Sequence, residues 1–556
     1  MRQGMKQLLG AFALVSAVFF GPFNQAKSQD TLHSPLPIPL KFSGNFGEIR
    51  TGHFHTGLDV RTEGRAGIPV LAAHDGAVSR VKVSHRGYGL ALYLNGGGLT
   101  SVYAHLSQFH PRIEAWLMEQ QYADEKWAFD GRPSSAFSFS AGDTIGWSGN
   151  TGGSFGPHLH FELRDARTQR PINPLHWTFE GSGVTQDMVP PEFRGVWVVP
   201  ETTGTVEGSP DRFRWTSAYG EGLRVAGPFS LGVEGFDRLD GERFTHGPYG
   251  IDVWMNDSLI HSHRMDTLDF STNADVAAHI DLPAWQDRKG RVHRVQRLPG
   301  NRLDIYQRTS GRSSCSVEPG DSARLEVLLL DAAGNETRTG LWLWGDSVAI
   351  AKDTLNPAPF EYNLPHRLEV EDVVVEVPAN ALYGDATIDI DRSDSGRITV
   401  WSEARVTRSD YTLTVPVPSA FMGSGDPMVL CAVDEKGEVE EAWVSDERNG
   451  HIQVRLDRFG YFEVRQDTVA PVLGQPALVD GVLTISIGDD LSGMDRWEGR
   501  CGEHWMRWGL DKGVLSYALS DGVLQDRTQE DIRVWCIDAA GNIGQKVFTL
   551  ASLQAE

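Results

Sequence analysis

The amino-acid sequence predicts a mostly β protein built from several antiparallel β units in series. Short stretches in which apolar and polar residues alternate recur along the chain, and glycine-containing turns separate them. The turn sequence D-A-A-G-N occurs at residues 331–335 and again at residues 538–542, which indicates repeated domains. A chain of 556 residues with 16 Trp and 25 Phe has enough apolar surface for several cores, so wholesale disorder is excluded.

The first 28 residues have the pattern of a secretory signal peptide. Arg2 and Lys6 precede an apolar run at residues 8–20, and the small residues Ala26 and Ser28 follow it. The run is short for a membrane span of ~20 residues, so we expect cleavage after Ser28. The mature protein is then expected in the periplasm and cell envelope or secreted, and not as an integral membrane protein.

The net charge of −23 is unevenly distributed. Residues 29–180 hold 13 Lys and Arg against 14 Asp and Glu, so the acidity belongs to residues 181–556. This balance argues against a nucleic-acid-binding function, which requires a basic surface. Strong net charge favours solubility of an extracytoplasmic protein.

Residues 29–180 are predicted to form an antiparallel β domain. Residues 78–83 and 90–94 alternate as strands do, and the sequence N-G-G-G follows the second of them as a turn. Residues 113–126 lack Gly and Pro and are predicted to form a helix on an inserted loop.

Three further β units are predicted after residue 180: residues 181–345, residues 346–466 and residues 467–556. In the first and third of these, an alternating strand leads into D-A-A-G-N and a closing strand follows. These two segments resemble bacterial immunoglobulin-like β-sandwich domains, whereas residues 346–466 are predicted to be a β domain of no identified type. Cys501 and Cys536 both fall in the last unit, and a disulfide between them is compatible with an oxidising compartment.

Three short motifs in residues 52–162 carry candidate catalytic chemistry. They are G-H-F-H-T-G-L-D with His55 and Asp59, Y-A-H-L-S with His105, and H-L-H-F-E with His158 and His160. On a strand, residues two apart point to the same face, so the imidazoles of the last motif are expected side by side. Two imidazoles and one carboxylate suit Zn²⁺, with a fourth position left for water or substrate.

The three motifs, in this order and with G-N-T-G-G-S before the last, resemble the lysostaphin/LytM-type zinc metalloendopeptidases over about residues 40–178. The resemblance implies that Zn²⁺ is held by His55, Asp59 and His160, and that His105 and His158 are the catalytic pair. It also implies hydrolysis of peptide bonds in peptidoglycan stems or cross-bridges. In that reaction zinc polarises the scissile carbonyl and activates water, one of the two histidines takes the water proton, and the other stabilises the oxyanion or acts as general acid.

Several interpretations stay open at this level. One alternative is a non-catalytic envelope scaffold or regulator that binds muropeptide or a partner protein, and another is a zinc protease acting on extracellular proteins. Glu162 is either a hydrogen-bond partner of a zinc ligand or a carboxylate at the rim of the site. Compared with a compact member of this family, the chain has extra residues at about 109–139. They are expected to form a long loop near the groove that alters substrate access. The acidic β domains are interpreted as spacers, modules that bind cell wall or envelope proteins, or regulators that block the groove.

Overall fold

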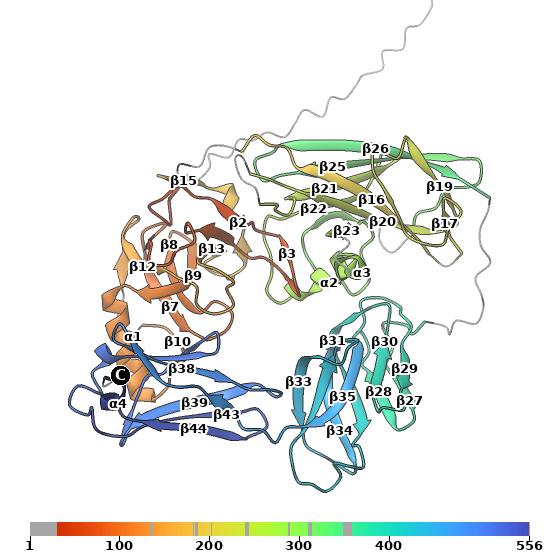
Figure 1. Ribbon diagram of the computed structural model, residues 1–556. Coiled ribbons are helices and arrows are strands. Elements are labelled where there is room, and N and C mark those ends of the chain that lie inside the picture. Colours follow the sequence, from red (N-terminus) through yellow and green to blue (C-terminus); the bar gives the residue numbers. More distant parts are fainter. Residues whose placement is uncertain are drawn as a thin grey trace, which may run out of the picture.

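The computed structural model describes residues 31–133, 137–181, 183, 187–201, 203–239, 244–286, 290–309, 314–347 and 359–554. The predicted signal peptide therefore lies outside the described residues. None of the helices in the described ranges combines the length and the apolar character needed to cross a bilayer. The fold is mostly β, as the sequence predicts, and four groups of strands are arranged around a ring (Figure 1).

The first group of strands is an antiparallel sheet that carries the three motifs. Its central path runs β10 (Phe129–Gly131), β7 (Gly76–Val83), β8 (Leu90–Gly96), β9 (Leu99–Phe109), β13 (His158–Asp165), β5 (Leu58–Arg61) and β2 (Phe42–Gly44). Short strands extend it at β6 (Pro69–Leu71), β11 (Ser138–Phe139), β12 (Thr144–Ser148) and β14 (Pro171–Ile172), while β1 (Thr31–His33) pairs with β15 (Thr178–Glu180) and β3 (Ile49–Arg50) with β4 (His53–Phe54). The strands predicted at residues 78–83 and 90–94 are confirmed within β7 and β8.

The predicted helix on the insertion is present as α1 (Pro111–Asp124). Proline at its first position and the His110 ring, which accepts a hydrogen bond from the Arg112 amide, begin the helix. Its buried face consists of Ile113, Leu117 and Gln121, and the two apolar residues join the core of the first sheet. The helix therefore packs against the sheet and is part of the fold.

The second group of strands forms a sandwich of two sheets with its own core. One sheet is β18 (Phe213–Trp215), β16 (Glu192–Pro200), β20 (Phe229–Phe236) and β23 (Val292–Arg294). The other is β17 (Thr205–Val206), β19 (Gly222–Ala226), β26 (Glu336–Gly345), β25 (Ser322–Leu330), β21 (Gly250–Met255), β22 (Ser258–Arg264) and β24 (Tyr306–Thr309). Between β22 and β23 the chain forms η2 (Asn273–Asp275), α2 (Val276–His279) and α3 (Leu282–Gln286), which face the first sheet (Figure 1).

The third and fourth groups are also pairs of packed sheets with separate cores. The third pairs β27 (His366–Val370), β28 (Val373–Val377), β31 (Val406–Pro416) and β34 (His451–Arg458) with β29 (Asp389–Arg392), β30 (Ile398–Trp401), β35 (Gly460–Gln466), β32 (Met428–Val433) and β33 (Val439–Ser445). The fourth pairs β36 (Val472–Leu473), β37 (Ala477–Val479), β38 (Val482–Gly488), β42 (Val514–Ala518) and β41 (Gly509–Asp511) with β40 (His504–Trp505), β39 (Met494–Cys501), β43 (Ile532–Asp538) and β44 (Ile543–Phe548), and α4 (Leu550–Gln554) follows.

The two D-A-A-G-N turns have the same internal hydrogen bonds. The amide and the side chain of Asn335 donate to the carboxylate of Asp331 at 2.8 and 2.7 Å, and Asn542 does the same with Asp538 at 2.8 and 2.9 Å. The glycine of each turn has a positive φ, 94° in one and 93° in the other, which favours glycine there. The repeat in the sequence is thus a repeat of one turn geometry before the last strand of each sandwich.

The four cysteines are free thiols, so the disulfide considered for Cys501 and Cys536 is not formed. The two residues lie on the neighbouring strands β39 and β43, but Cys501 is opposite Ile532 and Cys536 is opposite Trp497. They are therefore four positions apart along the ladder, about 13 Å at the rise of a strand, which is beyond the reach of a disulfide.

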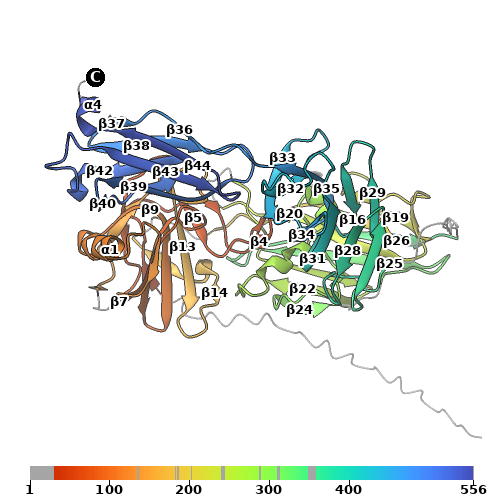
Figure 2. The same ribbon diagram turned by 90° about the horizontal axis from the view of Figure 1, so that it is seen from below.

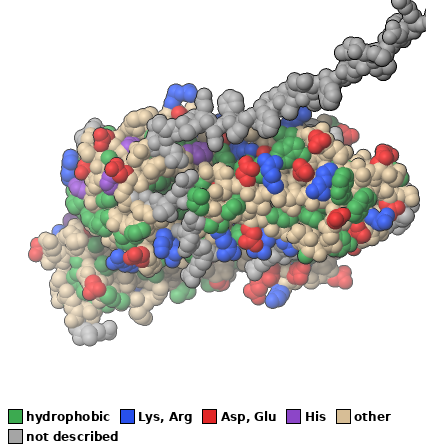
Figure 3. Space-filling view, turned by 90° about the horizontal axis from the view of Figure 1, so that it is seen from above, with side chains coloured by type: hydrophobic (Ala, Val, Ile, Leu, Met, Phe, Trp, Pro, Cys, Tyr) green, Lys and Arg blue, Asp and Glu red, His purple; other side chains and the backbone are tan. Residues whose placement is uncertain are grey.

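The fourth group of strands returns to the first and packs on α1, as Figures 1 and 2 both show. The Arg507 side chain donates to Glu114 and Gln121 of α1 at 3.3 and 3.0 Å, and to Asp521 of its own domain. Trp127 meets Trp497 with ring centroids 6.2 Å apart. The insertion at 109–139 is therefore covered by the C-terminal domain over this face. On the face seen in Figure 3, acidic and basic side chains are interspersed and no continuous basic patch is present among the residues drawn in colour.

Candidate metal centre and active site

The central strand β13 presents His158 and His160 on one face of the sheet. The intervening Leu159 and the following Phe161 are fully buried in the core on the other face, as the alternation in the sequence predicts. His160 lies opposite Asp59 of β5 on one side and opposite Ala104 of β9 on the other. Strand pairing alone thus brings together His160, Asp59 and Ala104, the residue before His105.

His105 reaches the same face through an irregularity in β9. The register between β8 and β9 shifts between Leu90 and Leu92, so that Ala104 and His105 together oppose a single residue. His105 itself has a φ of 59°, in the left-handed region. A β-bulge of this kind turns a side chain away from the regular alternation, which aims the His105 ring at His158. Their ring centroids are 4.7 Å apart.

Three candidate ligand atoms form a nearly equilateral triangle. Nε2 of His55 lies 3.0 Å from Nδ1 of His160 and 3.0 Å from Oδ1 of Asp59, and the last two atoms are 3.1 Å apart. A tetrahedral Zn²⁺ with bonds of ~2.0–2.2 Å separates its ligand atoms by roughly 3.3–3.6 Å, so a small outward movement accommodates the ion. All three side chains are buried, and the donor set of two imidazoles and one carboxylate fits zinc.

The remaining polar atom of each candidate ligand has a partner that orients it. Nδ1 of His55 donates to the Asn45 carbonyl at 2.8 Å, so its Nε2 carries a lone pair. Nε2 of His160 donates to Glu162 at 2.8 Å, which leaves Nδ1 as the nitrogen that faces the site. Oδ2 of Asp59 accepts from Arg50 at 2.9 Å, which leaves Oδ1 for the site. Such second partners fix the tautomer and the direction of a metal ligand.

Glu162 lies behind His160 and is fully buried, which decides between the two interpretations open for it. Its carboxylate accepts from Thr56 and Arg164, each at 2.7 Å, and also from Tyr88. Burial opposes its ionisation, but Arg164 and His160 hold the pKa of Glu162 well below its usual range. Glu162 is therefore an anion that orients His160 and not a carboxylate at the rim.

Close backbone approach explains the glycine of the H-T-G-L-D segment. A Cβ on Gly57 would lie 2.4 Å from the Phe161 carbonyl oxygen and 2.8 Å from Cγ of Glu162. Any side chain at this position would therefore push β13 away from the loop that carries His55. The requirement is steric and not conformational, because Gly57 does not have a positive φ.

His105 and His158 are held alike, each through its Nδ1. That atom lies 2.8 Å from the Thr151 carbonyl in His105 and 2.8 Å from the Gly156 carbonyl in His158. Donation from Nδ1 leaves Nε2 of each ring as the nitrogen for proton transfer. In His158 this Nε2 lies 3.4 Å from Oδ1 of Asp59. Burial and the nearby His160 and His158 rings lower the pKa of His105 to about 3, which keeps that ring neutral.

The G-N-T-G-G-S loop also contacts the C-terminal domain. Lys512 donates to the Asn150 carbonyl at 2.6 Å, and the Gly152 amide donates to Asp511 at 3.2 Å. Thr151, between these two residues, is the one whose carbonyl holds His105. The turn between β41 and β42 therefore fixes the loop from outside.

The structure brings together all five residues selected from the sequence, and it adds partners that the sequence did not single out. Arg50, Asn45 and Tyr88 have no motif of their own, and only the pairing of distant strands and loops places them at the site. The second sandwich also contributes. The side-chain amide of Asn273 pairs with the backbone of Phe54, the residue before His55. Its oxygen accepts from the Phe54 amide and its nitrogen donates to the Phe54 carbonyl, at 2.9 Å each.

Comparison with known proteins finds relatives for part of the chain. No protein-family model matches the sequence. The chain is 31% identical over 139 residues to the DD-carboxypeptidase/endopeptidase Mpg of Neisseria meningitidis serogroup B and to that of Neisseria gonorrhoeae, a match that covers 25% of this chain and 26% of each relative. The chain thus spans about a quarter of the length of these curated relatives.

Solved structures with similarity to the chain include two isolated catalytic domains. The catalytic domain of lysostaphin from Staphylococcus simulans is 26% identical and covers 24% of this chain and 86% of its own, with a TM-score of 0.18. The catalytic domain of the prophage-encoded M23 protein EnpA from Enterococcus faecalis is 26% identical over 24% of this chain and 89% of its own, with a TM-score of 0.19.

Proposed function

We propose that this chain, about a quarter of which is a lysostaphin/LytM-type (M23) peptidase domain, is a zinc metalloendopeptidase that hydrolyses peptide bonds in peptidoglycan stems or cross-bridges. The observation that carries the proposal is the triangle of His55 Nε2, Asp59 Oδ1 and His160 Nδ1, with edges of 3.0–3.1 Å, beside the paired rings of His105 and His158.

Zn²⁺ would be held by His55, Asp59 and His160, and when bound it supplies Lewis-acid polarisation of the scissile carbonyl and a water of lowered pKa. Asp59 brings one negative charge to the site, and Arg50 holds its other oxygen and so fixes the direction of the carboxylate. Asn45 and Glu162 hold the two imidazoles in the tautomers that such a site requires.

The two remaining histidines would move the protons. Each ring offers Nε2, because Nδ1 is engaged by a backbone carbonyl. A neutral imidazole accepts a proton from the attacking water, and the protonated ring then donates to the departing amine. The second ring would donate a hydrogen bond to the oxyanion from Nε2, which requires its imidazolium form with a proton on both nitrogens. The backbone contacts of the two rings are alike and fit either assignment of the two roles.

The substrate follows from the relatives and from the compartment. The curated relatives are named as DD-carboxypeptidase/endopeptidases, and the predicted signal peptide would bring the mature chain to the compartment where peptidoglycan lies. Location in the periplasm and cell envelope, or secretion, is therefore part of the proposal. The strand-rich domains after residue 180 would position the peptidase relative to the wall.

The test is digestion of purified peptidoglycan by the mature chain, residues 29–556, with and without a chelator. We expect soluble muropeptides whose release stops with the chelator and returns with Zn²⁺, and their masses identify the bond that is cut. Folded, zinc-loaded protein that releases no fragments would favour the non-catalytic scaffold. Cleavage of casein in place of peptidoglycan would favour a protease of extracellular proteins.

A further inference from the structure

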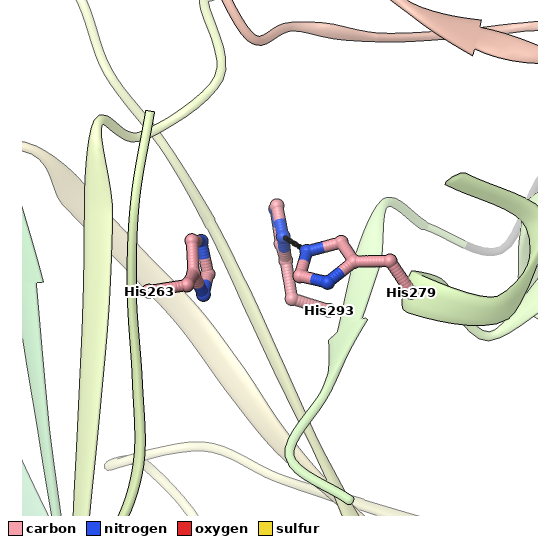
Figure 4. A group of neighbouring side chains, drawn as sticks. All are labelled: His263, His279 and His293. Carbon is pink, nitrogen blue, oxygen red and sulfur yellow. Dashed lines mark hydrogen bonds between the residues drawn. The ribbon is translucent and has the colours of Figure 1, made fainter. Parts of the chain in front are cut away.

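A second group of metal-ligating side chains lies inside the second sandwich, away from the peptidase motifs. His263 on β22, His279 at the end of α2 and His293 on β23 each offer one ring nitrogen, and the three nitrogens lie within 4.8 Å of one another. Figure 4 shows the His263 ring facing the rings of His293 and His279, which are joined by a contact of 2.8 Å. All three residues are at most 2% exposed.

We propose that His263, His279 and His293 form a second zinc site, which has a structural role. Three imidazoles that converge on one point from three different elements are a donor set suited to Zn²⁺. The separation of the three nitrogens is compatible with a tetrahedral ion after small rotations of the rings. The fourth position is open to a water molecule or to a neighbouring group.

The hydrogen-bond chain that enters this cluster leaves one nitrogen without a partner. Nδ1 of His261 donates to the Val295 carbonyl at 2.8 Å, so its Nε2 is an acceptor. That atom lies 2.9 Å from Nδ1 of His263, which must then be the donor. Nε2 of His263 is consequently an unprotonated lone pair, and it is buried with no hydrogen-bond partner in the described part of the chain.

A buried acceptor without a partner is destabilising, so a ligand for it is favoured. A metal ion meets the need of this lone pair. On the opposite side of the cluster, Nδ1 of His279 lies 2.8 Å from the Tyr306 hydroxyl, which itself accepts from Asn301 at 2.8 Å. Donation from His279 to Tyr306 would direct the His279 Nε2 lone pair into the cluster, an arrangement common among metal-ligating histidines.

The protonation states fit the same interpretation. Burial, with the neighbouring rings, lowers the pKa of His263 and of His279 well below the usual value, and it lowers the pKa of His293 to about 3. Neutral imidazole is the form that binds a metal, through the unprotonated nitrogen of its ring.

The position of the cluster gives the ion a structural role. β22 and β23 belong to the two different sheets of the sandwich, and α2 lies in the connection between them. The cluster also adjoins the interface with the peptidase domain. The His279 ring contacts the Phe54 ring edge to face at 5.5 Å, and Asn273, just before α2, bonds the Phe54 backbone. An ion bound here would thus hold the segment that supports the residue next to His55.

The first experiment counts metal ions without altering the proposed site. The mature chain carrying His160→Ala is loaded with Zn²⁺, dialysed and analysed for bound zinc, and a sample loaded with Co²⁺ is examined for the visible absorption of a tetrahedral ion. We expect about one equivalent of zinc and a tetrahedral cobalt spectrum. A folded His160→Ala chain that retains no zinc and gives only the spectrum of octahedral aqueous cobalt overturns the proposal.

The second experiment locates the ion. Adding His263→Ala or His279→Gln to the His160→Ala chain is expected to remove the remaining equivalent, whereas His504→Ala, at an exposed position of β40, should retain it. Retention of the ion in both cluster variants would place it elsewhere and overturn the assignment. Removing zinc from the His160→Ala chain with a chelator should also speed hydrogen exchange of the Phe54 amide at least tenfold, because the segment that carries Asn273 loses its support. Unchanged exchange would refute the structural role.

Discussion

Arg50 donates to Oδ2 of Asp59 at 2.9 Å and thereby leaves Oδ1 as the Asp59 oxygen that faces His55 and His160. The guanidinium also bonds Glu48 at 3.3 Å, so it is held from both sides. We predict that Arg50→Gln weakens Zn²⁺ binding about 10–100-fold, as loss of a group that orients a metal ligand does. Competition with a chromophoric chelator measures the change. Arg65→Gln, which removes an exposed arginine paired with Glu63, is the control and should have no effect.

The two histidines of the H-x-H motif are expected to differ in their effect on zinc. His160→Ala should lose the ion and the activity together, because Nδ1 of His160 is one corner of the ligand triangle. His158→Ala should keep most of the zinc and lose turnover by about 100-fold or more. Atomic absorption and fragment release from peptidoglycan measure the two properties. Loss of zinc in His158→Ala would show that the roles within the motif are assigned wrongly.

Gly57→Ala should disrupt the site for steric reasons alone. The added Cβ would stand 2.4 Å from the Phe161 carbonyl oxygen, so β13 and the loop with His55 must separate. We expect a loss of about 1–3 kcal/mol of stability together with reduced zinc affinity. Gly460→Ala, where a Cβ meets nothing within 4 Å, is the matched control for thermal unfolding. Equal behaviour of the two variants would contradict the steric account.

Arg507 is predicted to hold the C-terminal domain on α1. Its guanidinium bridges Asp521, which is almost fully buried, to Glu114 across the interface. Arg507→Ala removes the donor to Glu114 and Gln121 across the interface and should cost about 1–2 kcal/mol of docking. Small-angle scattering would then report a larger radius of gyration, and a protease would cut sooner near residue 467. The exposed Arg533→Ala serves as the control, and an unchanged radius in Arg507→Ala would refute the prediction.

Asp237 should make stability depend on pH. Burial and the nearby Asp331 and Asp187 raise the pKa of Asp237 to about 7, above its value in the unfolded chain. Between pH 4 and 7 the unfolded chain therefore loses a proton that the folded chain keeps, so stability falls as the pH rises. We expect the ionisation of Asp237 to lower the free energy of unfolding by about 3 kcal/mol between pH 5 and pH 8. Denaturant unfolding of the native chain and of Asp237→Asn at both pH values isolates this term, which should vanish in the variant.

Much of the candidate site was predictable because its signals are local. Histidines at alternate positions between apolar residues predict a strand with both imidazoles on one face, and β13 has that arrangement. The bulge at His105 was not predictable, since it depends on how β8 and β9 align. Arg50 and Asn45 carried no local signal either. Each meets its partner only where separate strands and loops come together.

The sequence by itself determined the mostly β class, the helix on the insertion and the five residues of the candidate site, because period, composition and motif spacing act over a few residues. Only the tertiary structure decided that Glu162 supports His160, that Cys501 and Cys536 stay apart, and that α1 is covered by the C-terminal domain. It also brought His263, His279 and His293 to one point. These relationships join segments that are distant in the chain, and the packing of sheets, which no short pattern encodes, sets the distances between them.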